Sequence, residues 1–404
     1  MKVLLFAPNA GLSFSTGGGS GFGLKLAEIL LSEGHKVTLA GYHSLSLPVL
    51  DSIHGTRVSE YSDRVYLARA THYDHAFPIY RNLPFKLSAY SGLLAPSFDR
   101  WVRRTLENSR DDILVFQDDV PIGALPAMKD RTSYVYVHYP FLGLRADLIP
   151  PLRSVLTSIE WANDRLLALL SSRLILANPA EFADTVWTNS TITARVVASV
   201  WPDSEPQCVP TYVDPPCRPI EAKSQPATIL SLGSLQPAKN HALLLAAFSQ
   251  TQTVHATTRL VIAGHARDSA YVRYLRRKIS RLKLGNTVHL IRDISRENLR
   301  TLMNAASVMV HPALFEPFGL ALLEGMASGC VGVATRSEFA GGWVDILERG
   351  RFGLGFTTRE DLAQVLDSLL SSPAYIRELS MKATERAALF SRGRLRARVT
   401  PFFR

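Results

Sequence analysis

Short apolar runs alternate with amphipathic stretches along most of the chain. The first run, Val3–Phe6, is followed by a glycine-rich loop, a helical pattern over Gly23–Glu33 and a second apolar run, Lys36–Ala40. Apolar runs of this length predict buried strands. Later runs of the same kind in the first half are Ile113–Phe116, Tyr134–Val137, Leu174–Ala177 and Thr185–Thr188. Because helical patterns separate most of these runs, we expect an α/β fold with a parallel sheet covered by helices on both faces.

The alternation stops at a proline-rich stretch, residues 202–226, and then starts again. Clustered prolines predict a linker between domains. Beyond it, strand patterns over Ile229–Leu232, Leu260–Ala263, Val288–Ile291, Ser307–Val310 and Val331–Ala334 alternate with helical patterns over Asn240–Ser249 and Arg296–Ala305. We therefore predict two doubly wound Rossmann-like domains, residues 1–212 and 213–389, facing a central cleft at their strand ends. Residues 390–404 are expected to cross back to the first domain.

Composition narrows the class of protein. With 404 residues, 47% hydrophobic and 20% charged, the chain is long enough for two globular domains and is not of disordered composition. No stretch approaches about 18 consecutive apolar residues, so no membrane-spanning helix is predicted. The apolar run at the N-terminus is too short for a secretory signal. Cys208, Cys217 and Cys330 are widely spaced and odd in number, which suits a reducing compartment and neither a disulfide framework nor a metal site.

The formal net charge of +10 belongs to the C-terminal half. Residues 1–215 carry 19 basic and 21 acidic side chains, whereas the remainder carries 26 and 14. The basic excess is concentrated in Arg273–Lys283 and Arg392–Arg404. Such a balance indicates an anionic substrate, an anionic membrane or nucleic acid as a partner, unless these stretches are only solvated helix faces.

The region Thr71–Arg104 departs from the alternating pattern because it mixes aromatic side chains with cations. This mixture favours a membrane interface or an acceptor that carries sugar and phosphate. The alternative is an irregular excursion of the first domain that packs a small core of its own.

Two loops follow strands and precede helices, which is the position of phosphate-binding loops. In the first, Ser15–Gly23, the backbone at Gly18 and Gly19 can approach a diphosphate or an acceptor closely. Its glycine spacing matches neither a dinucleotide fingerprint nor a P-loop, so a nicotinamide enzyme is disfavoured. In the second loop, Ser234 follows a glycine and Lys239 lies near the helix start, where its charge can neutralise a phosphate. An exposed lysine beside a capping asparagine is the alternative.

His138 ends the strand pattern Tyr134–Val137. The carboxyl end of a parallel strand faces the expected cleft, where a histidine can bind a sugar hydroxyl or carry a proton. A structural histidine with satisfied hydrogen bonds is the alternative.

Glu316 and Glu324 lie eight positions apart in the segment HPALFEPFGLALLEGMASG. Glu316 follows an apolar strand pattern, and Pro317–Gly319 forms the turn that opens a helix containing Glu324. A helix N-terminus binds anions through its free amides and its dipole. Two carboxylates flanking such a site suit a sugar nucleotide, with amides for the diphosphate and acids for the ribose and the sugar. Two solvated glutamates are the alternative.

No Asp-x-Asp pattern, which a metal-dependent sugar-nucleotide enzyme usually needs, occurs in the sequence. We therefore expect no metal and no cofactor. Main-chain amides and cations would have to stabilise a departing diphosphate.

Together these residues resemble glycosyltransferase family 4, the retaining enzymes of the GT-B fold. The resemblance rests on the first glycine loop, His138, VWTNST at Val186–Thr191, the Lys239 loop, IAG at Ile262–Gly264 and, most specifically, the E-x7-E signature from Glu316 to Glu324. It implies that Glu324 holds the nucleotide ribose and that Glu316 lies against the transferred sugar. It also implies that amides around Phe318, Gly319 and Leu320 hold the diphosphate and sugar.

The resemblance implies a metal-independent transferase that moves a hexose, mannose from GDP-mannose, to a lipid-linked or other glycan acceptor. It implies a cytoplasmic protein in peripheral contact with an anionic membrane, and no nucleic acid partner. One position departs from the family: an arginine usually follows the glycine of the second loop, where this chain has Ser234. Diphosphate stabilisation then depends on Lys239 and the helix dipole, with help from Arg267. The alternatives are a phosphorylase with pyridoxal phosphate and a non-catalytic basic protein that binds membranes or nucleic acid.

Overall fold

A computed structural model describes residues 1–6, 18–41, 46–69, 96–117, 124–138, 181–213, 227–251, 258–266 and 269–404. The chain divides into two compact units, and the division falls between Thr211 and Tyr212, inside the proline-rich stretch. The first unit contains the described residues up to Thr211 and also Leu395–Arg404. The second contains the described residues of Tyr212–Arg394.

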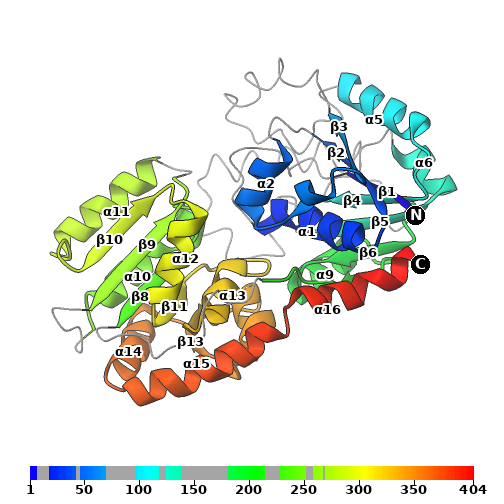
Figure 1. Cartoon of the computed structure of the whole chain (residues 1–404). Coiled ribbons are helices and arrows are strands. Elements are labelled where there is room, and N and C mark those ends of the chain that lie inside the picture. Colours follow the sequence, from blue (N-terminus) through cyan, green and yellow to red (C-terminus); the bar gives the residue numbers. More distant parts are fainter. Residues whose placement is uncertain are drawn as a thin grey trace. The chain divides into compact units, whose positions relative to one another are not determined.

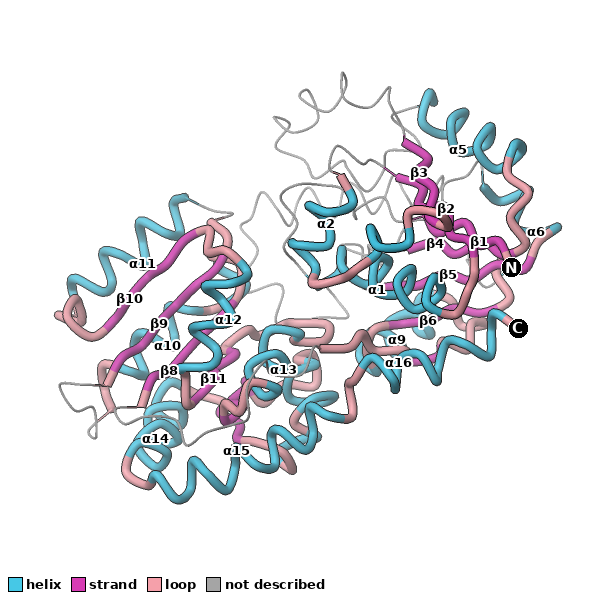
Figure 2. The backbone as a smooth tube through the Cα atoms, viewed as in Figure 1, coloured by secondary structure: helices cyan, strands magenta, loops and turns pink. Residues whose placement is uncertain are grey.

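The first unit is built on a parallel sheet of seven described strands (Figures 1 and 2). Its elements are β1 (Lys2–Phe6), α1 (Gly18–Ser32), β2 (Lys36–Gly41), α2 (Leu47–His54), β3 (Val65–Arg69), α5 (Pro96–Asn108), β4 (Ile113–Gln117), α6 (Leu125–Asp130), β5 (Thr132–Val137), β6 (Thr185–Thr188), α9 (Thr191–Val200) and β7 (Gln207–Cys208). The strand order is β3-β2-β1-β4-β5-β6-β7, the Rossmann order with one further strand at the edge.

Helix α1 begins earlier than its sequence predicts. We expected a loop through Gly23, but the helix already includes Gly18 and Gly19. Glycine is a poor helix former, yet nearly every described side chain of α1 is buried, including Lys25 and Glu28, each about 5% exposed or less. Packing around the helix outweighs the low propensity of its first turn.

The end of the chain returns to the first unit within α16 (Arg392–Val399). The Tyr134 hydroxyl on β5 donates to the Phe402 carbonyl over 2.9 Å, and the rings of Trp187 and Phe402 lie 5.1 Å apart. Phe403 is 2% exposed and also packs against these strands. Figure 1 shows the two chain ends near each other at this sheet.

The second unit repeats the same architecture with six described parallel strands. Its elements are β8 (Thr228–Leu232), α10 (His241–Phe248), β9 (Arg259–Gly264), α11 (Ser269–Arg281), β10 (Val288–Arg292), α12 (Arg296–Ala305), β11 (Val308–His311), α13 (Leu320–Ala327), β12 (Val331–Thr335), β13 (Leu354–Phe356), α14 (Arg359–Leu370) and α15 (Pro373–Ala388). The strand order, β10-β9-β8-β11-β12-β13, is again the Rossmann order.

Each face of the second sheet is covered by its own core. One core combines alternate strand residues with side chains of α10, α11 and α14, and the other combines the remaining strand residues with α12, α13 and α15. Burial on both faces explains why the strands read as continuous apolar runs. The predicted fold class, two doubly wound Rossmann-like domains, is confirmed.

Two features expected from the sequence lie wholly or mostly outside the described residues. The strand expected at Leu174–Ala177 lies outside the described residues, as does most of the aromatic and cationic region Thr71–Arg104, whose last part belongs to α5. In the part of the chain that the structure describes, no helix is both long and apolar enough to cross a membrane.

Candidate active site

The direction of connection along the second sheet reverses between the adjacent strands β8 and β11. In open α/β sheets, ligands bind outside the carboxyl ends of the strands at such a switch point. The loop after β8 carries Ser234 and Lys239, and the loop after β11 carries Glu316. The fold therefore places two of the predicted loops side by side.

Lys239 is positioned by a tight turn between β8 and α10. The chain forms one short turn of 3-10 helix, Pro237–Lys239, and then Asn240 takes the left-handed conformation with φ 53° and ψ 31°. The lysine stem passes close to Gly233, where an added Cβ would make ordinary van der Waals contact with Lys239 Cγ and Cδ at 3.5 Å. The ammonium is thereby directed to the loop that follows β11.

Lys239 and Glu316 form an ion pair through Lys239 Nζ and Glu316 Oε2. Their side chains are only 20% and 19% exposed, so water screens the pair weakly. Burial by itself raises the pKa of Glu316, but the charge of Lys239 and hydrogen bonding from His311 lower that pKa overall. Glu316 is therefore held as a carboxylate beside a cation.

His311 is a further residue of this cluster that sequence reasoning missed. It is the last residue of β11, is 4% exposed, and places Nε2 3.7 Å from Glu316 Oε2. Its position at the carboxyl end of a strand is the signal that singled out His138, and the same rule would have found His311.

His241 follows Lys239 by two residues and is the first residue of α10. It is 1% exposed, and its Nδ1 lies 3.3 Å from Ser231 Oγ. Burial, followed by the charges of Lys239 and His311, lowers the pKa of His241 to about 3. The imidazole is therefore neutral throughout the physiological range.

The lowered pKa of His241 makes stability depend on pH. Between pH 6.5 and pH 3 the unfolded chain protonates this histidine and the folded chain does not, so its contribution to stability is present above pH 6.5 and is lost as the pH falls. From pH 7 to pH 5.5 this loss amounts to about 1 kcal/mol. From pH 7 to pH 5.5, the free energy of unfolding of His241→Asn should fall by about 1 kcal/mol less than that of the wild type. Denaturant unfolding at both pH values measures this difference. An equal loss in both proteins would contradict the neutral assignment.

The backbone of Glu316 is fixed by a segment far along the chain. Its N–H donates to the Phe339 carbonyl at 3.1 Å, and its carbonyl accepts from the Gly341 N–H at 2.7 Å. Gly341 has no room for a side chain, because a Cβ would lie 2.3 Å from the Pro317 carbonyl oxygen. Residues 339–341 thus set the direction in which the Glu316 side chain leaves the backbone.

Arg386 on α15 holds the chain just beyond this segment. Its guanidinium donates to the carbonyls of Asp345 (2.6 Å) and Ile346 (3.0 Å) and pairs with Glu348 at 2.7 Å. Helix α15 therefore anchors the segment that follows residues 339–341.

Helix α13 starts after Gly319, which adopts φ 96° and ψ 43°. This left-handed conformation favours glycine and turns the chain sharply into the helix. Phe318 is 4% exposed and packs on Phe390 with ring centroids 5.8 Å apart, while Leu320 is partly buried in the same core. Their side chains anchor the turn, which leaves the amides at the helix start for a ligand.

Glu324 lies on α13, more than one turn beyond the helix start, and its side chain is 19% exposed. Arg296, the first residue of α12, places Nη2 3.8 Å from Glu324 Oε1. The sequence reading did not identify Arg296, because nothing in its local pattern marks the contact. It supplies a second cation beside the helix that carries Glu324.

The other predicted site residues make no described contact with the Lys239–Glu316 pair. Ser234 is half-buried in the loop after β8, and Gly18 and Gly19 form the start of α1. His138 directly follows β5 in the first unit. Its ring packs edge-on to Tyr136 at 4.8 Å, and its carbonyl accepts from Thr193 Oγ1 at 3.0 Å. Arg267 lies outside the described residues.

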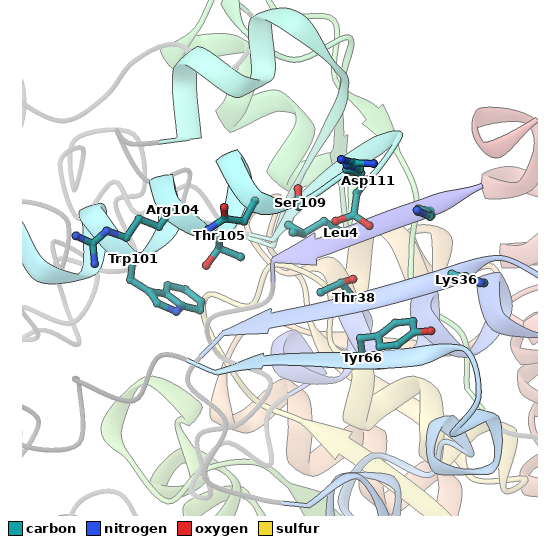
Figure 3. Close-up of a pocket in the computed structure, with 12 residues that line it drawn as sticks. Leu4, Lys36, Thr38, Tyr66, Trp101, Arg104, Thr105, Ser109 and Asp111 are labelled. Carbon is teal, nitrogen blue, oxygen red and sulfur yellow. The ribbon is translucent and has the colours of Figure 1, made fainter.

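A separate cavity of about 750 Å³ lies in the first unit (Figure 3). It is bounded by Thr38 and Tyr66 on the strands and by Trp101 and Arg104 on α5, and it extends to Lys36 at the start of β2. It lies at the amino ends of the strands, and no predicted site residue is among its described lining residues. We therefore do not place the candidate active site there.

No cluster of three or more metal-ligating side chains occurs within the described ranges. The expectation that no metal is needed stays a prediction.

Comparisons with known proteins point to a family of transferases. The family described as Glycosyl transferases group 1 matches residues 217–389. The chain is 27% identical over 294 residues to the GDP-Man:Man(3)GlcNAc(2)-PP-Dol alpha-1,2-mannosyltransferase of Dictyostelium discoideum, covering 64% of this chain and 56% of the relative. It is 31% identical over 238 residues to the mouse protein of the same name, covering 54% and 46%. The matched region thus spans about half the length of these relatives.

Solved structures support the fold. The sucrose-phosphate synthase of Thermosynechococcus elongatus is similar with a TM-score of 0.74 and 18% identity, covering 100% of this chain and 98% of that one. The family match and the twin Rossmann-like sheets confirm the resemblance read from the sequence: this chain has a GT-B fold, and its residues 217–389 are a glycosyl transferase group 1 domain.

Proposed function

We propose that the chain is a retaining hexosyltransferase that moves mannose from GDP-mannose to a lipid-linked or other glycan acceptor without a metal ion. The single observation that carries the proposal is the cluster of Glu316, Lys239 and His311 at the switch point of the second sheet. The choice of mannose rests on the names of the relatives.

The proposed donor site begins at the N-terminus of α13. Amides at Gly319 and Leu320 bind the diphosphate, because this helix end carries free N–H groups and partial positive charge. Glu324 accepts hydrogen bonds from the ribose, and Glu316 faces the hexose. Lys239, which Glu316 holds in place, neutralises the diphosphate where the family usually has an arginine at the position of Ser234.

In the proposed reaction, the bond between the anomeric carbon and the diphosphate oxygen breaks, and the acceptor hydroxyl oxygen bonds to the same face of that carbon. The hydroxyl proton passes to the departing diphosphate, so no side-chain base is required. The cations Lys239 and Arg296 and the amides of α13 stabilise the charge on the leaving group. His138 of the first unit orients a sugar hydroxyl.

The acceptor side is assigned to the first unit, whose glycine-rich helix start at Gly18 and Gly19 offers main-chain amides. We place the protein at the cytosolic face of an anionic membrane, in keeping with a lipid-linked acceptor and with the net charge of +10.

Nucleotide recognition can be tested by thermal unfolding with GDP-, UDP- and ADP-sugars. A ligand at a hundredfold excess over its Kd stabilises the folded state by about 2.7 kcal/mol, a shift of roughly 5–10 °C for a unit of this size. We expect this shift with GDP-mannose in the wild type and a much smaller one in Glu324→Gln.

Equal shifts of the unfolding temperature in the wild type and in Glu324→Gln would show that Glu324 does not bind the ribose. If no sugar nucleotide shifts the transition and the protein instead binds DNA with steep salt dependence, the non-catalytic alternative replaces the proposal.

A further inference from the structure

The solvent-facing side of α11 is strongly cationic. The helix buries Tyr271, Val272, Leu275 and Ile279 in the core of the second unit. On the opposite side lie Arg273, Arg277 and Arg281, spaced four residues apart and therefore stacked along one face of the helix. Arg276 and Tyr274 flank this row and are also exposed. We call these five residues the α11 face.

Within the second unit as described, nothing neutralises the α11 face. No acidic residue occurs from Ser269 to Gly285. Arg273 makes a long hydrogen bond of 3.4 Å to Ser269 Oγ, and none of the four arginines has an ion-pair partner among the described residues. Like charges four residues apart repel, so the row destabilises its own helix.

The surroundings extend the positive surface. Lys283 is exposed just beyond the helix, and the adjacent edge strand β10 ends at exposed Arg292, which is followed by the exposed carboxylate of Asp293. Figure 1 shows α11 and β10 together at the outer edge of the second unit. The donor cluster lies elsewhere in this unit, at β8 and β11, so the α11 face has no part in holding the donor.

We propose that the α11 face docks on a bilayer of anionic phospholipids. A helix with one apolar face packed inside the protein and arginines on the other matches a negatively charged plane, to which each cation adds attraction. Tyr274, 43% exposed, has the amphipathic ring that membrane interfaces favour. This inference rests on the membrane contact of the proposed function and names the surface that makes it.

The test is flotation of the full chain with vesicles of phosphatidylcholine, with or without phosphatidylserine, at about 0.1 M salt. We expect binding only with phosphatidylserine, and its loss at high salt. The variant Arg273→Gln/Arg277→Gln/Arg281→Gln should bind roughly 100-fold more weakly, since three cations are removed. The matched control Arg377→Gln/Arg392→Gln/Arg394→Gln removes the same charge from exposed positions of α15 and α16 and should bind almost normally.

Equal weakening in the two triple variants would mean that total charge, not the α11 face, governs binding. Absence of vesicle binding in the wild type, or binding to duplex DNA that needs the α11 face, would also overturn the inference. Sugar transfer to a soluble acceptor should be the same in the wild type and in the α11 variant. Loss of vesicle binding with transfer intact therefore separates this inference from the proposed activity.

Discussion

Replacing Glu316 with glutamine is expected to lower turnover roughly 100- to 1000-fold, the size of effect seen when one preorganised electrostatic group is removed from an active site. The substitution keeps the volume of the side chain but removes the charge that pairs with Lys239. Because the pair is about four-fifths buried, we also expect a loss of about 1–3 kcal/mol in stability. Transfer from the proposed donor, GDP-mannose, measures the first effect, and denaturant unfolding measures the second.

Lys239→Met should reduce turnover to a similar extent, since Lys239 and Glu316 act as one unit. The double variant should then be no slower than either single variant. Glu378→Gln is the matched control, because Glu378 is an exposed glutamate of α15 that pairs with Lys382. Purified Glu316→Gln with full activity would refute the assignment of this residue.

Gly341→Ala is expected to have the second-largest effect, although residue 341 makes only main-chain contacts with the site. A methyl group there would meet the Pro317 carbonyl oxygen at 2.3 Å and Phe318 Cα at 2.6 Å, both backbone atoms that cannot rotate away. The segment must shift and carry Glu316 with it. We expect turnover to fall at least about 100-fold, because misplacement by about 1 Å is enough for such a loss, together with a loss of roughly 1–3 kcal/mol in stability.

Gly393→Ala provides the comparison for this variant. Gly393 lies in α16, where an added Cβ would meet nothing within 4 Å, so alanine should leave turnover unchanged and stabilise the helix slightly. Gly341→Ala with normal turnover would show that the segment 339–341 does not position Glu316.

The parts of the fold that follow local patterns could be predicted from the sequence. Buried parallel strands such as β8 and β11 read as continuous apolar runs. The strand-to-helix position of the loop after β8 singled out Lys239, and the helix start after β11 singled out Glu316. The start of α1 was misplaced, because its early glycines suggest a loop while burial on all sides favours a helix.

The supporting residues of the site could not be found in the same way. Arg296 meets Glu324, and Gly341 meets Glu316, only after the helices pack on the sheet. Neither contact leaves a periodic or compositional trace in the sequence. His311 is the exception, since the strand-end rule applies to it as directly as to His138.

The return of the chain end to the first unit has a consequence for biosynthesis. Residues 395–404 leave the ribosome only after the whole second unit has been made, yet Phe402 and Phe403 complete the aromatic packing on Tyr134 and Trp187. The first unit therefore cannot reach its final core while its nascent chain is still being extended through the second. During that interval the aromatic side chains on β5 and β6 stay uncovered. Because exposed apolar surface promotes aggregation, this is the period in which a chaperone would be most needed.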